Sequence, residues 1–313
     1  MLDFLFHYGL FVAKTVTICI LIVLTFGFIF SIIARAKRSE GSFNILNINE
    51  KLEDIQESFE RETLPKKKFK DFIKQRKKAL KQQKTDENKK RLFVIKFDGD
   101  IRATQVAELR EIITAVLATA NSNDEVLVIL ESAGGFVHQY GLAASQLKRI
   151  RDRGILLTVA IDKLAASGGY LMACVANKII AAPFAIVGSI GVVGQMPNFH
   201  KLLEKNHIEF EQHTAGEHKR TITMFGKNTE KDRKKFREEL DLTHQLFKDF
   251  IDEHRPIVDL AKVATGEHWH ASYAMQFNLV DAVMTSDDYI LSNHPAKAIF
   301  EISYITKHTL KDK

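Results

Sequence analysis

Two short stretches of the sequence place a serine close to a pair of glycines, ESAGGF at 131–136 and AASGGY at 165–170. Each follows an apolar run, so each is expected at the carboxyl end of a buried strand, where ligands bind in open α/β sheets. Glycines there let backbone N–H groups approach a ligand, and a helix start adds positive dipole. One loop therefore offers a site for an oxyanion, and the other presents the hydroxyl of Ser167 as a nucleophile.

A serine nucleophile needs a base within hydrogen-bonding reach. Four histidines lie downstream: His200, His207, His213 and His218. None stands beside an identifiable acidic partner, and spacing alone does not establish a triad. A lysine can serve where removal from water favours its uncharged amine. Lys219 follows the strand-like IEFEQHT at 208–214, which would direct it back toward the sheet. Taken alone, a lysine in so charged a stretch is usually a solvent-exposed cation.

These motifs resemble those of the signal peptide peptidase A (SppA) family in its SohB branch, relatives of ClpP with a crotonase-like fold. The resemblance covers essentially the whole chain. It implies that Ser167 of the A-S-G-G-Y motif is the nucleophile and Lys219 the general base. It further implies that Ser189, in G-S-I-G, orients the lysine, and that the backbone amides of Gly135 and Gly168 form the oxyanion hole.

Two parts of the sequence depart from the family pattern. Ala133 stands where the family has a proline before the glycine pair. Losing that ring costs on the order of 0.4–1 kcal/mol of preorganisation, which should reduce activity without abolishing it. Ala271 and Asn278 stand where the family has glycines near the C-terminus. Asparagine is the usual substitute for glycine in a left-handed cap, so the second of these changes is expected to be harmless.

The resemblance implies a serine endopeptidase that hydrolyses peptide bonds in signal peptides or in unfolded and membrane-protein fragments, without a cofactor. It also implies a homo-oligomer whose subunits restrict access to the site. Nothing in the sequence selects one physiological substrate.

Two other functions remain open at this stage. A crotonase-like acyl-CoA enzyme would use the same pair of backbone amides, would bind CoA and would need neither Ser167 nor Lys219. A non-catalytic membrane scaffold would retain the two residues as vestiges, and the departure at Ala133 favours it slightly. Labelling of Ser167 by a fluorophosphonate would argue against both.

Neither a metal site nor a cysteine nucleophile is indicated. The histidines of GEHWH at 266–270 are two residues apart, do not share a helix face and form no H-E-x-x-H pattern, so no metal is expected. Cys174 is expected to be a small buried residue.

From residue 92 the sequence alternates between strand and helix patterns. Strands are expected at 92–97, 125–131, 155–161 and 178–183, and helices at 103–120, 138–151 and 168–176. The near-continuous apolar run at 125–131 indicates a strand covered on both faces. This repetition predicts an α/β domain with much parallel sheet. The resemblance makes it a repeated ββα spiral of the crotonase/ClpP type.

The run at 15–34 has 20 residues without a charge and spans roughly 30 Å as a helix, which matches a bilayer core. A cleaved signal peptide fits less well, because RAKR at 35–38 follows where a small-residue cleavage site would stand. By the positive-inside rule, these basic residues favour the cytoplasmic side for the bulk of the chain. We therefore expect a single-pass protein of the bacterial inner membrane, with its catalytic domain in the cytoplasm.

The charge of the chain is concentrated in one segment. The net charge is +6 overall, but residues 66–91 carry 13 Lys/Arg and 3 Asp/Glu, so the rest is net negative. This weakens any prediction of nucleic-acid binding. The basic tract could instead bind anionic lipid headgroups or simply be a solvated linker.

The predicted organisation has five parts. They are a short segment at 1–14, a transmembrane helix at 15–34, a basic helical linker at 35–91, the peptidase domain at 92–291 and a tail at 292–313. Within the linker, two helices are expected, at 48–63 and 66–84.

Overall fold

The computed structural model describes residues 2–38, 41–84 and 89–306. The chain divides into two compact units. One is formed by residues 45–303, and the other by the segments on either side of it.

The N-terminal helix α1 (Leu2–Arg38) contains the predicted membrane-spanning run. Its segment His7–Gly27 has a mean hydropathy of 2.3 and, by length and composition, can cross a membrane. Hydroxyl groups within it donate to carbonyl groups four residues earlier, so they need no partner from outside the helix: Thr15, Thr17 and Thr25.

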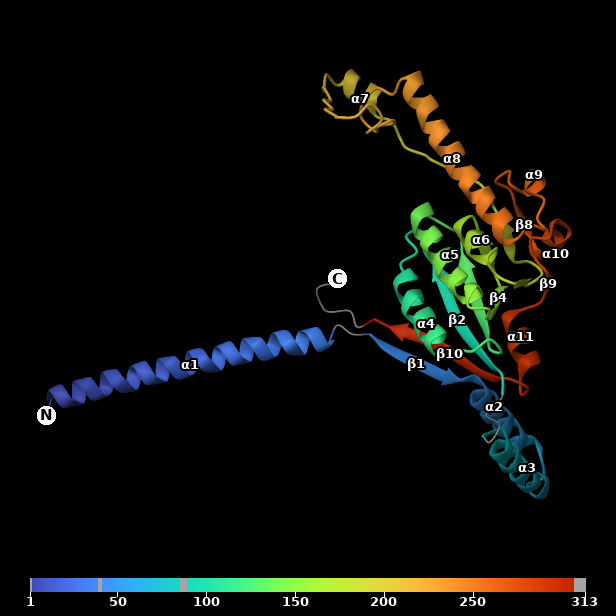
Figure 1. The fold of residues 1–313 in the computed structure, drawn as a ribbon, viewed down its shortest axis with the longest axis horizontal. Coiled ribbons are helices and arrows are strands. Elements are labelled where there is room, and N and C mark those ends of the chain that lie inside the picture. The colour runs from blue at the N-terminus through green and yellow to red at the C-terminus, as the bar shows by residue number, and fades with distance from the viewer. Residues whose placement is uncertain (1, 39–40, 85–88, 307–313) are drawn as a thin grey trace. The chain divides into compact units, whose positions relative to one another are not determined.

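A sheet with the strand order β1-β10-β2-β3-β4-β6-β9 forms the framework of the α/β fold (Figure 1). The strands of this path are β1 (Ser42–Asn47), β2 (Arg91–Gly99), β3 (Glu125–Ser132), β4 (Leu156–Ile161), β6 (Lys178–Ala181), β9 (Ala282–Val283) and β10 (Ala298–Ile305). Every described pairing from β10 to β9 is parallel, which confirms the parallel sheet that the sequence predicts. The segment assigned to the C-terminal tail supplies β10.

Three short strands branch from this path and carry the chain toward the site. They are β5 (Leu164–Ala166), β7 (Ile186–Gly188) and β8 (His268–His270). β5 pairs with the last residue of β3, where Ser132 lies opposite Ala165, and it pairs with β7 on its other side. β8 runs antiparallel to β7. β3 therefore pairs with β4 along most of its length and with β5 at its end.

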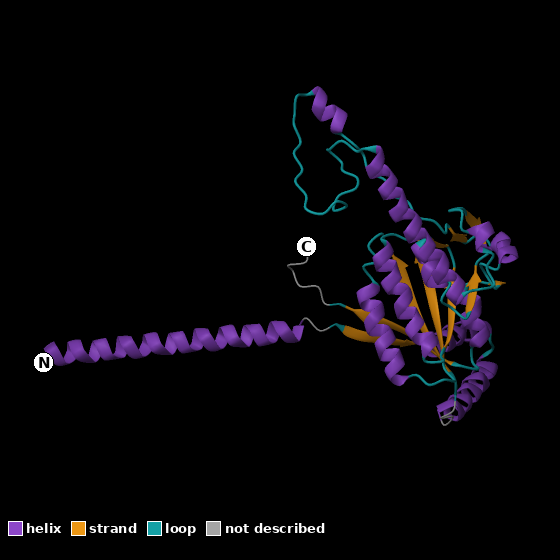
Figure 2. Ribbon diagram, turned by 45° about the horizontal axis from the view of Figure 1, so that its top comes forward, coloured by secondary structure: helices purple, strands orange, loops and turns teal. Residues whose placement is uncertain are grey.

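Helices α4 (Val106–Thr119) and α5 (Val137–Asp152) lie side by side against the sheet, and α6 (Gly168–Ala173) packs beside α5 (Figure 2). The buried side chains of α4 recur at the spacing of one helix face: Val106, Leu109, Ile112, Ile113 and Val116. The central part of β3 is fully buried, as its continuous apolar run predicts.

The chain forms further helices outside these layers. They are α2 (Ile48–Thr63), α3 (Lys66–Lys84), α7 (His200–Lys205), α8 (Glu230–His254), α9 (Leu260–Val263), α10 (Ala271–Ala274), the 3₁₀ turn η1 (Met275–Phe277) and α11 (Ser286–Asn293). The bounds of α2 and α3 agree with the sequence prediction. The 25-residue α8 begins with a capping box, in which Thr229 and Asp232 exchange side-chain and backbone hydrogen bonds.

Two local sequence predictions have clear outcomes. The strand-like segment 208–214 is not a strand, because it pairs with no sheet edge and its residues are exposed, including Ile208 and Phe210. Alternation alone does not form a strand without a partner. Asn278 ends η1 with φ of 58°, which confirms that asparagine takes the left-handed position of the family glycine.

A buried carboxylate joins the starts of β2 and β3. Asp124 accepts hydrogen bonds from the backbone and guanidinium of Arg91 and from the amide of Asn121. Burial opposes the charged form of this carboxylate, but these hydrogen bonds outweigh it and hold the pKa of Asp124 below its usual value. The charged form therefore stabilises the folded chain above the unfolded-state pKa, and this contribution is lost as the pH falls through the folded-state pKa.

We expect Asp124→Asn to lower the free energy of unfolding at pH 7 by about 2–3 kcal/mol, because buried donors lose a charged acceptor. The difference from the native chain should shrink as acid protonates the native carboxylate. Urea unfolding of the full-length protein in detergent, followed by the fluorescence of Trp269, measures it. Asp152→Asn is the control, since it breaks only an exposed pair with Lys148 and should cost under about 0.5 kcal/mol. Equal losses in the two variants would contradict this account.

Candidate active site

The two glycine-containing loops lie in direct contact. A Cβ atom added to Gly134 would stand 2.6 Å from the backbone nitrogen of Gly168, and one added to Gly169 would stand 2.6 Å from the carbonyl oxygen of Ser132. The pairing of β3 with β5 brings the loops together, and the absence of side chains lets their backbones meet. The structure therefore places the two predicted loops at one point.

Ser167 sits at this contact in a backbone conformation that L-residues rarely adopt. Its φ is 52° and its ψ is −117°. Such a position costs on the order of 1–3 kcal/mol and persists only when the surroundings fix it. Here the amide of Ser167 donates to the carbonyl of Gly188 at 2.8 Å, and its carbonyl accepts from the amide of Leu171 at 3.0 Å. The side chain is half-buried, and its hydroxyl has no hydrogen-bond partner among the described residues.

Two backbone amides next to Ser167 are also unengaged. Within the described part of the chain, the N–H groups of Gly135 and Gly168 meet no hydrogen-bond acceptor, whereas that of Gly134 donates to the hydroxyl of Ser132. A Cβ on Gly135 would lie 2.0 Å from the carbonyl oxygen of Ile101, so only glycine fits there. These amides are free to donate to an oxyanion, and their assignment as the oxyanion hole stays a prediction.

Tyr140 contacts both loops. The sequence analysis did not identify it. It is fully buried, and its hydroxyl bonds to that of Ser132 and donates to the carbonyl of Asp100 at 2.7 Å. Its ring lies where a Cβ on Gly168 would stand, 2.4 Å from Cγ. Burial raises the pKa of Tyr140, so the phenol stays protonated. The sequence signal that could have identified Tyr140 is its place on the apolar face of the helix predicted at 138–151.

The loops open into a cavity of about 810 Å³. Its floor contains Ser167 and Ser189, and Ser189 also has a φ of 52° while its amide donates to the carbonyl of Glu267. Its wall comes from α8, which contributes Thr243, His244, Leu246, Phe247 and Phe250. Four of the five predicted site residues, all except Lys219, therefore lie together: the serines and the glycines at 135 and 168.

Lys219 lies elsewhere in the single chain. It is exposed, it belongs to the segment between α7 and α8, and it does not line the cavity. The ion pair of Glu217 with Lys231 fixes this segment to the first turn of α8. Thr243, where α8 reaches the cavity, is twelve residues further along, or about 18 Å at 1.5 Å per residue. The meeting of Lys219 with Ser167 stays a prediction.

His244 lines the cavity and was missed by the sequence analysis. Its Nε2 atom is buried and has no partner among the residues described. No sequence pattern indicated this position, because helix α8 was not predicted. Cys174, by contrast, is fully buried as expected, and burial raises the pKa of its thiol, which excludes it as a nucleophile in this fold.

We expect Tyr140→Phe to lower the free energy of unfolding by about 1–3 kcal/mol, because the Ser132 hydroxyl and the Asp100 carbonyl lose a buried partner. Hydrogen exchange of the Gly134 amide should accelerate, since its acceptor Ser132 is released. Tyr273→Phe is the control, as that side chain is 58% exposed. An unchanged stability in Tyr140→Phe would show that the loops do not depend on this hydroxyl.

Comparison with known proteins assigns the whole chain to one family. Residues 3–147 match the model "Peptidase family S49 N-terminal" and residues 149–299 match "Peptidase family S49". The chain is 49% identical over 315 residues to the "Probable protease SohB" of Buchnera aphidicola subsp. Schizaphis graminum, a match that covers 98% of this chain and 92% of the relative.

Two more relatives bear the same name. That of Haemophilus influenzae is 47% identical over 324 residues, covering 99% of this chain and 92% of the relative. That of Buchnera aphidicola subsp. Acyrthosiphon pisum is 57% identical over 226 residues, covering 72% and 67%. These matches confirm the resemblance that the glycine-loop motifs indicated, and the chain belongs to peptidase family S49.

Proposed function

We propose that this peptidase is a membrane-anchored serine endopeptidase in which Ser167 attacks the substrate and Lys219 is the base. The observation that supports it most is the state of Ser167. Its hydroxyl is unengaged, its backbone is strained, and it faces a cavity between two unengaged glycine amides. Strained, incompletely bonded groups of this kind cluster at active sites.

The reaction follows from these groups. The uncharged amine of Lys219 takes the proton of the Ser167 hydroxyl as the oxygen bonds to the peptide carbonyl carbon. The oxyanion that forms accepts from the amides of Gly135 and Gly168, donors worth roughly 2.7–4 kcal/mol each. The lysine then returns the proton to the leaving amine, which leaves an acyl-enzyme. Water, deprotonated by the same lysine, releases the acid and restores Ser167.

The exposed position of Lys219 supports an assembly in which a second copy of the chain supplies it. A base of this type must be withdrawn from water, and packing against another subunit does that. Apolar side chains that a partner would cover are present in the segment of Lys219, where Ile208 is 55% exposed, and at the cavity, where Val193 is 81% exposed. Leu246, which lines the cavity, is 61% exposed. Ser189 would then orient the arriving amine.

The cavity favours extended, apolar substrates. Its walls include Leu171, Phe247 and Phe250, and it lies beside the short strands that carry the catalytic loops. An extended peptide that pairs with a strand edge alternates its side chains, so that every second one enters such a wall. Signal peptides and unfolded or membrane-protein fragments fit this chemistry. The branching of β5 and β7 from the main sheet supports a spiral of the ClpP and crotonase type.

The N-terminal helix supports a single-pass anchor in the bacterial inner membrane. Its apolar segment is followed by Arg35, Lys37 and Arg38, which favour a cytoplasmic location for the peptidase unit. This location suits the removal of fragments left in the membrane.

We expect Ser167→Ala and Lys219→Ala each to abolish hydrolysis of an unfolded apolar peptide by the full-length protein. His244→Gln should retain it within about threefold, because the proposed mechanism gives that side chain no proton to transfer. Lys201→Ala is the matched control, because Lys201 is also an exposed lysine and lies in α7, just before the segment that contains Lys219. Loss of activity in His244→Gln together with full activity in Lys219→Ala would move the role of base to the histidine.

Mixing tests the source of the lysine. When chains carrying Ser167→Ala are co-assembled with chains carrying Lys219→Ala, sites that combine an intact serine with a partner's lysine should recover activity. A mixture as inactive as its components would contradict a lysine supplied by a second copy.

We expect Gly135→Ala to lower kcat/KM by about 10²–10³, because its Cβ meets the Ile101 carbonyl and the loop must move one oxyanion donor. Gly141→Ala is the control, since the Cβ there meets nothing within 4 Å. Peptide hydrolysis and thermal unfolding of both variants check this. Full activity in Gly135→Ala would exclude its amide from the site.

A further inference from the structure

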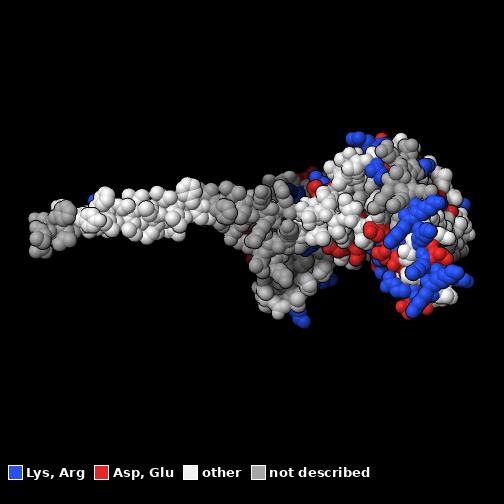
Figure 3. All heavy atoms as spheres, turned by 90° about the horizontal axis from the view of Figure 1, so that it is seen from below, with Lys and Arg blue, Asp and Glu red and all other residues white. Residues whose placement is uncertain are grey.

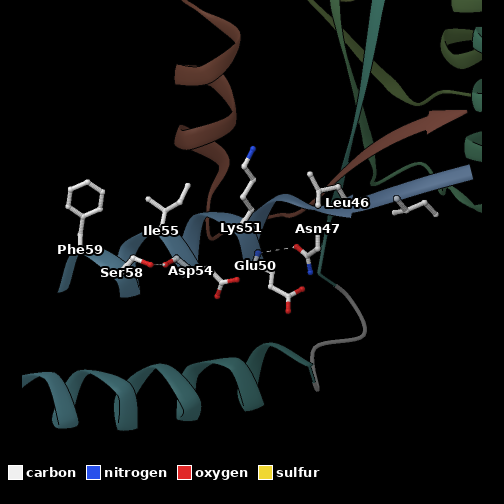
Figure 4. Close-up of a pocket in the computed structure, with 9 residues that line it drawn as sticks. Leu46, Asn47, Glu50, Lys51, Asp54, Ile55, Ser58 and Phe59 are labelled. Carbon is white, nitrogen blue, oxygen red and sulfur yellow. Dashed lines mark hydrogen bonds between the residues drawn. The ribbon is translucent and has the colours of Figure 1, made fainter. Parts of the chain in front are cut away.

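Helices α2 and α3 form a hairpin in which one arginine of α3 pairs with three of the six acidic residues of α2. Arg76 pairs with Asp54 at 3.0 Å and Glu53 at 3.6 Å, and it also pairs with Glu57. Its side chain is only 14% exposed. Figure 4 shows Asp54 on the side of α2 that faces α3, with Ile55 and Phe59 on the opposite side. Packing of the hairpin therefore engages a single cation of α3.

The apolar residues of α3 share the face of Arg76. Phe69, Phe72 and Ile73 are half-buried, and with Arg76 they follow the spacing of one helix side. The hairpin thus needs only this side of α3 to fold.

Seven of the lysines of α3 lie outside the face of Arg76 and take no part in the packing: Lys66, Lys67, Lys68, Lys70, Lys74, Lys77 and Lys78. All are exposed, and none forms an ion pair with a described residue. At about 100° per residue, all but Lys68 fall within an arc of about 120°. We call these six the lysine face of α3. Figure 3, viewed from the side on which α2 and α3 lie in Figure 1, shows Lys and Arg gathered there.

The lysine face has no structural use within the described chain and is unfavourable by itself. Like charges three and four residues apart on a helix repel each other, and Asp71 is the sole acid between Lys66 and Lys78. An anionic surface would relieve this repulsion. A bilayer that contains anionic phospholipid is such a surface, and six cations along one side of a helix match its extended geometry better than a small anion does.

We propose that the lysine face of α3 binds the surface of a bilayer containing anionic phospholipid. Covalent connection favours this occupant, because only 27 residues separate α3 from the end of α1. The inference rests on the proposed function in one respect: the proposed membrane anchor keeps α3 near the bilayer and so raises its effective concentration there. It gives residues 45–303 a second attachment to the bilayer besides the helix, which would hold the peptidase close to the surface from which its substrates come.

Lysine footprinting of the full-length protein tests the proposal without using activity. The protein is reconstituted in nanodiscs of phosphatidylcholine alone or with 30% phosphatidylglycerol and treated with an amine acetylating reagent, and each lysine is quantified by mass spectrometry. In the anionic discs at low salt, the lysine face should react at least fivefold more slowly. Because screening weakens such contacts, 0.5 M NaCl should remove the protection. Lys262, which is exposed on α9, should react equally in both discs.

A matched pair of variants isolates the lysine face. One carries Lys70→Gln, Lys74→Gln, Lys77→Gln and Lys78→Gln, and Lys66 then reports binding. The control variant replaces four lysines that each pair with an acid in the same unit: Lys96, Lys148, Lys163 and Lys262. Each basic residue near an anionic surface strengthens binding about fivefold, so the first variant should lose protection at Lys66 and the control should keep it. Glutamine keeps the helix propensity of lysine, and circular dichroism checks the fold.

Two results would overturn the proposal. One is equal reactivity of the lysine face in neutral and anionic discs. The other is protection of these lysines by added RNA or DNA with none by anionic discs, which would assign the face to nucleic acid. A protein that does not enter neutral discs at all would instead argue against the anchor, and a loss of peptide hydrolysis would concern the catalytic proposal alone.

Discussion

The site depends on the close contact between two backbone loops, one at the end of β3 and one at the end of β5. A Cβ atom on Gly134 would lie 2.6 Å from the backbone nitrogen of Gly168 and force the loops apart. A Cβ atom on Gly168 would lie 2.4 Å from the ring of Tyr140, which packs beneath it. The contact between the loops holds Ser167 at a positive φ, and the two glycines whose amides have no acceptor among the described residues line the same cavity. The parallel pairing of β3 with β4 along its length and with β5 at its end brings the loops together.

The single chain brings together the proposed nucleophile and oxyanion donors but not the proposed base. The proposed nucleophile and the two proposed oxyanion donors line one cavity, whereas the proposed base is exposed and distant along α8. A lysine in water is charged and cannot accept a proton, so a site completed only on assembly remains inactive in the isolated chain. The same arrangement would keep an unassembled peptidase from attacking its neighbours in the membrane.

The sequence was sufficient for the parts whose signals are local. Continuous apolar runs predicted the buried strands, helical spacing predicted α4 and α5, and paired glycines after strands predicted where Ser167 and Gly135 lie. It was insufficient where a side chain acquires its role from distant contacts. Tyr140 and His244 reach the cavity through helix packing, and the apolar alternation at 208–214 formed no strand because no edge was available to pair with it. Neither the sequence pattern nor the single chain brings Lys219 to Ser167, so their meeting stays a prediction.

The most direct measurement is the site of covalent modification by a fluorophosphonate in the full-length, membrane-reconstituted protein, mapped by mass spectrometry. An activated hydroxyl beside two oxyanion donors should give a single adduct, on the peptide that contains Ser167, and heat denaturation before labelling should remove it. If Ser167 stays unmodified while a serine hydrolase added to the same sample is labelled, the account of this site as a serine peptidase is contradicted.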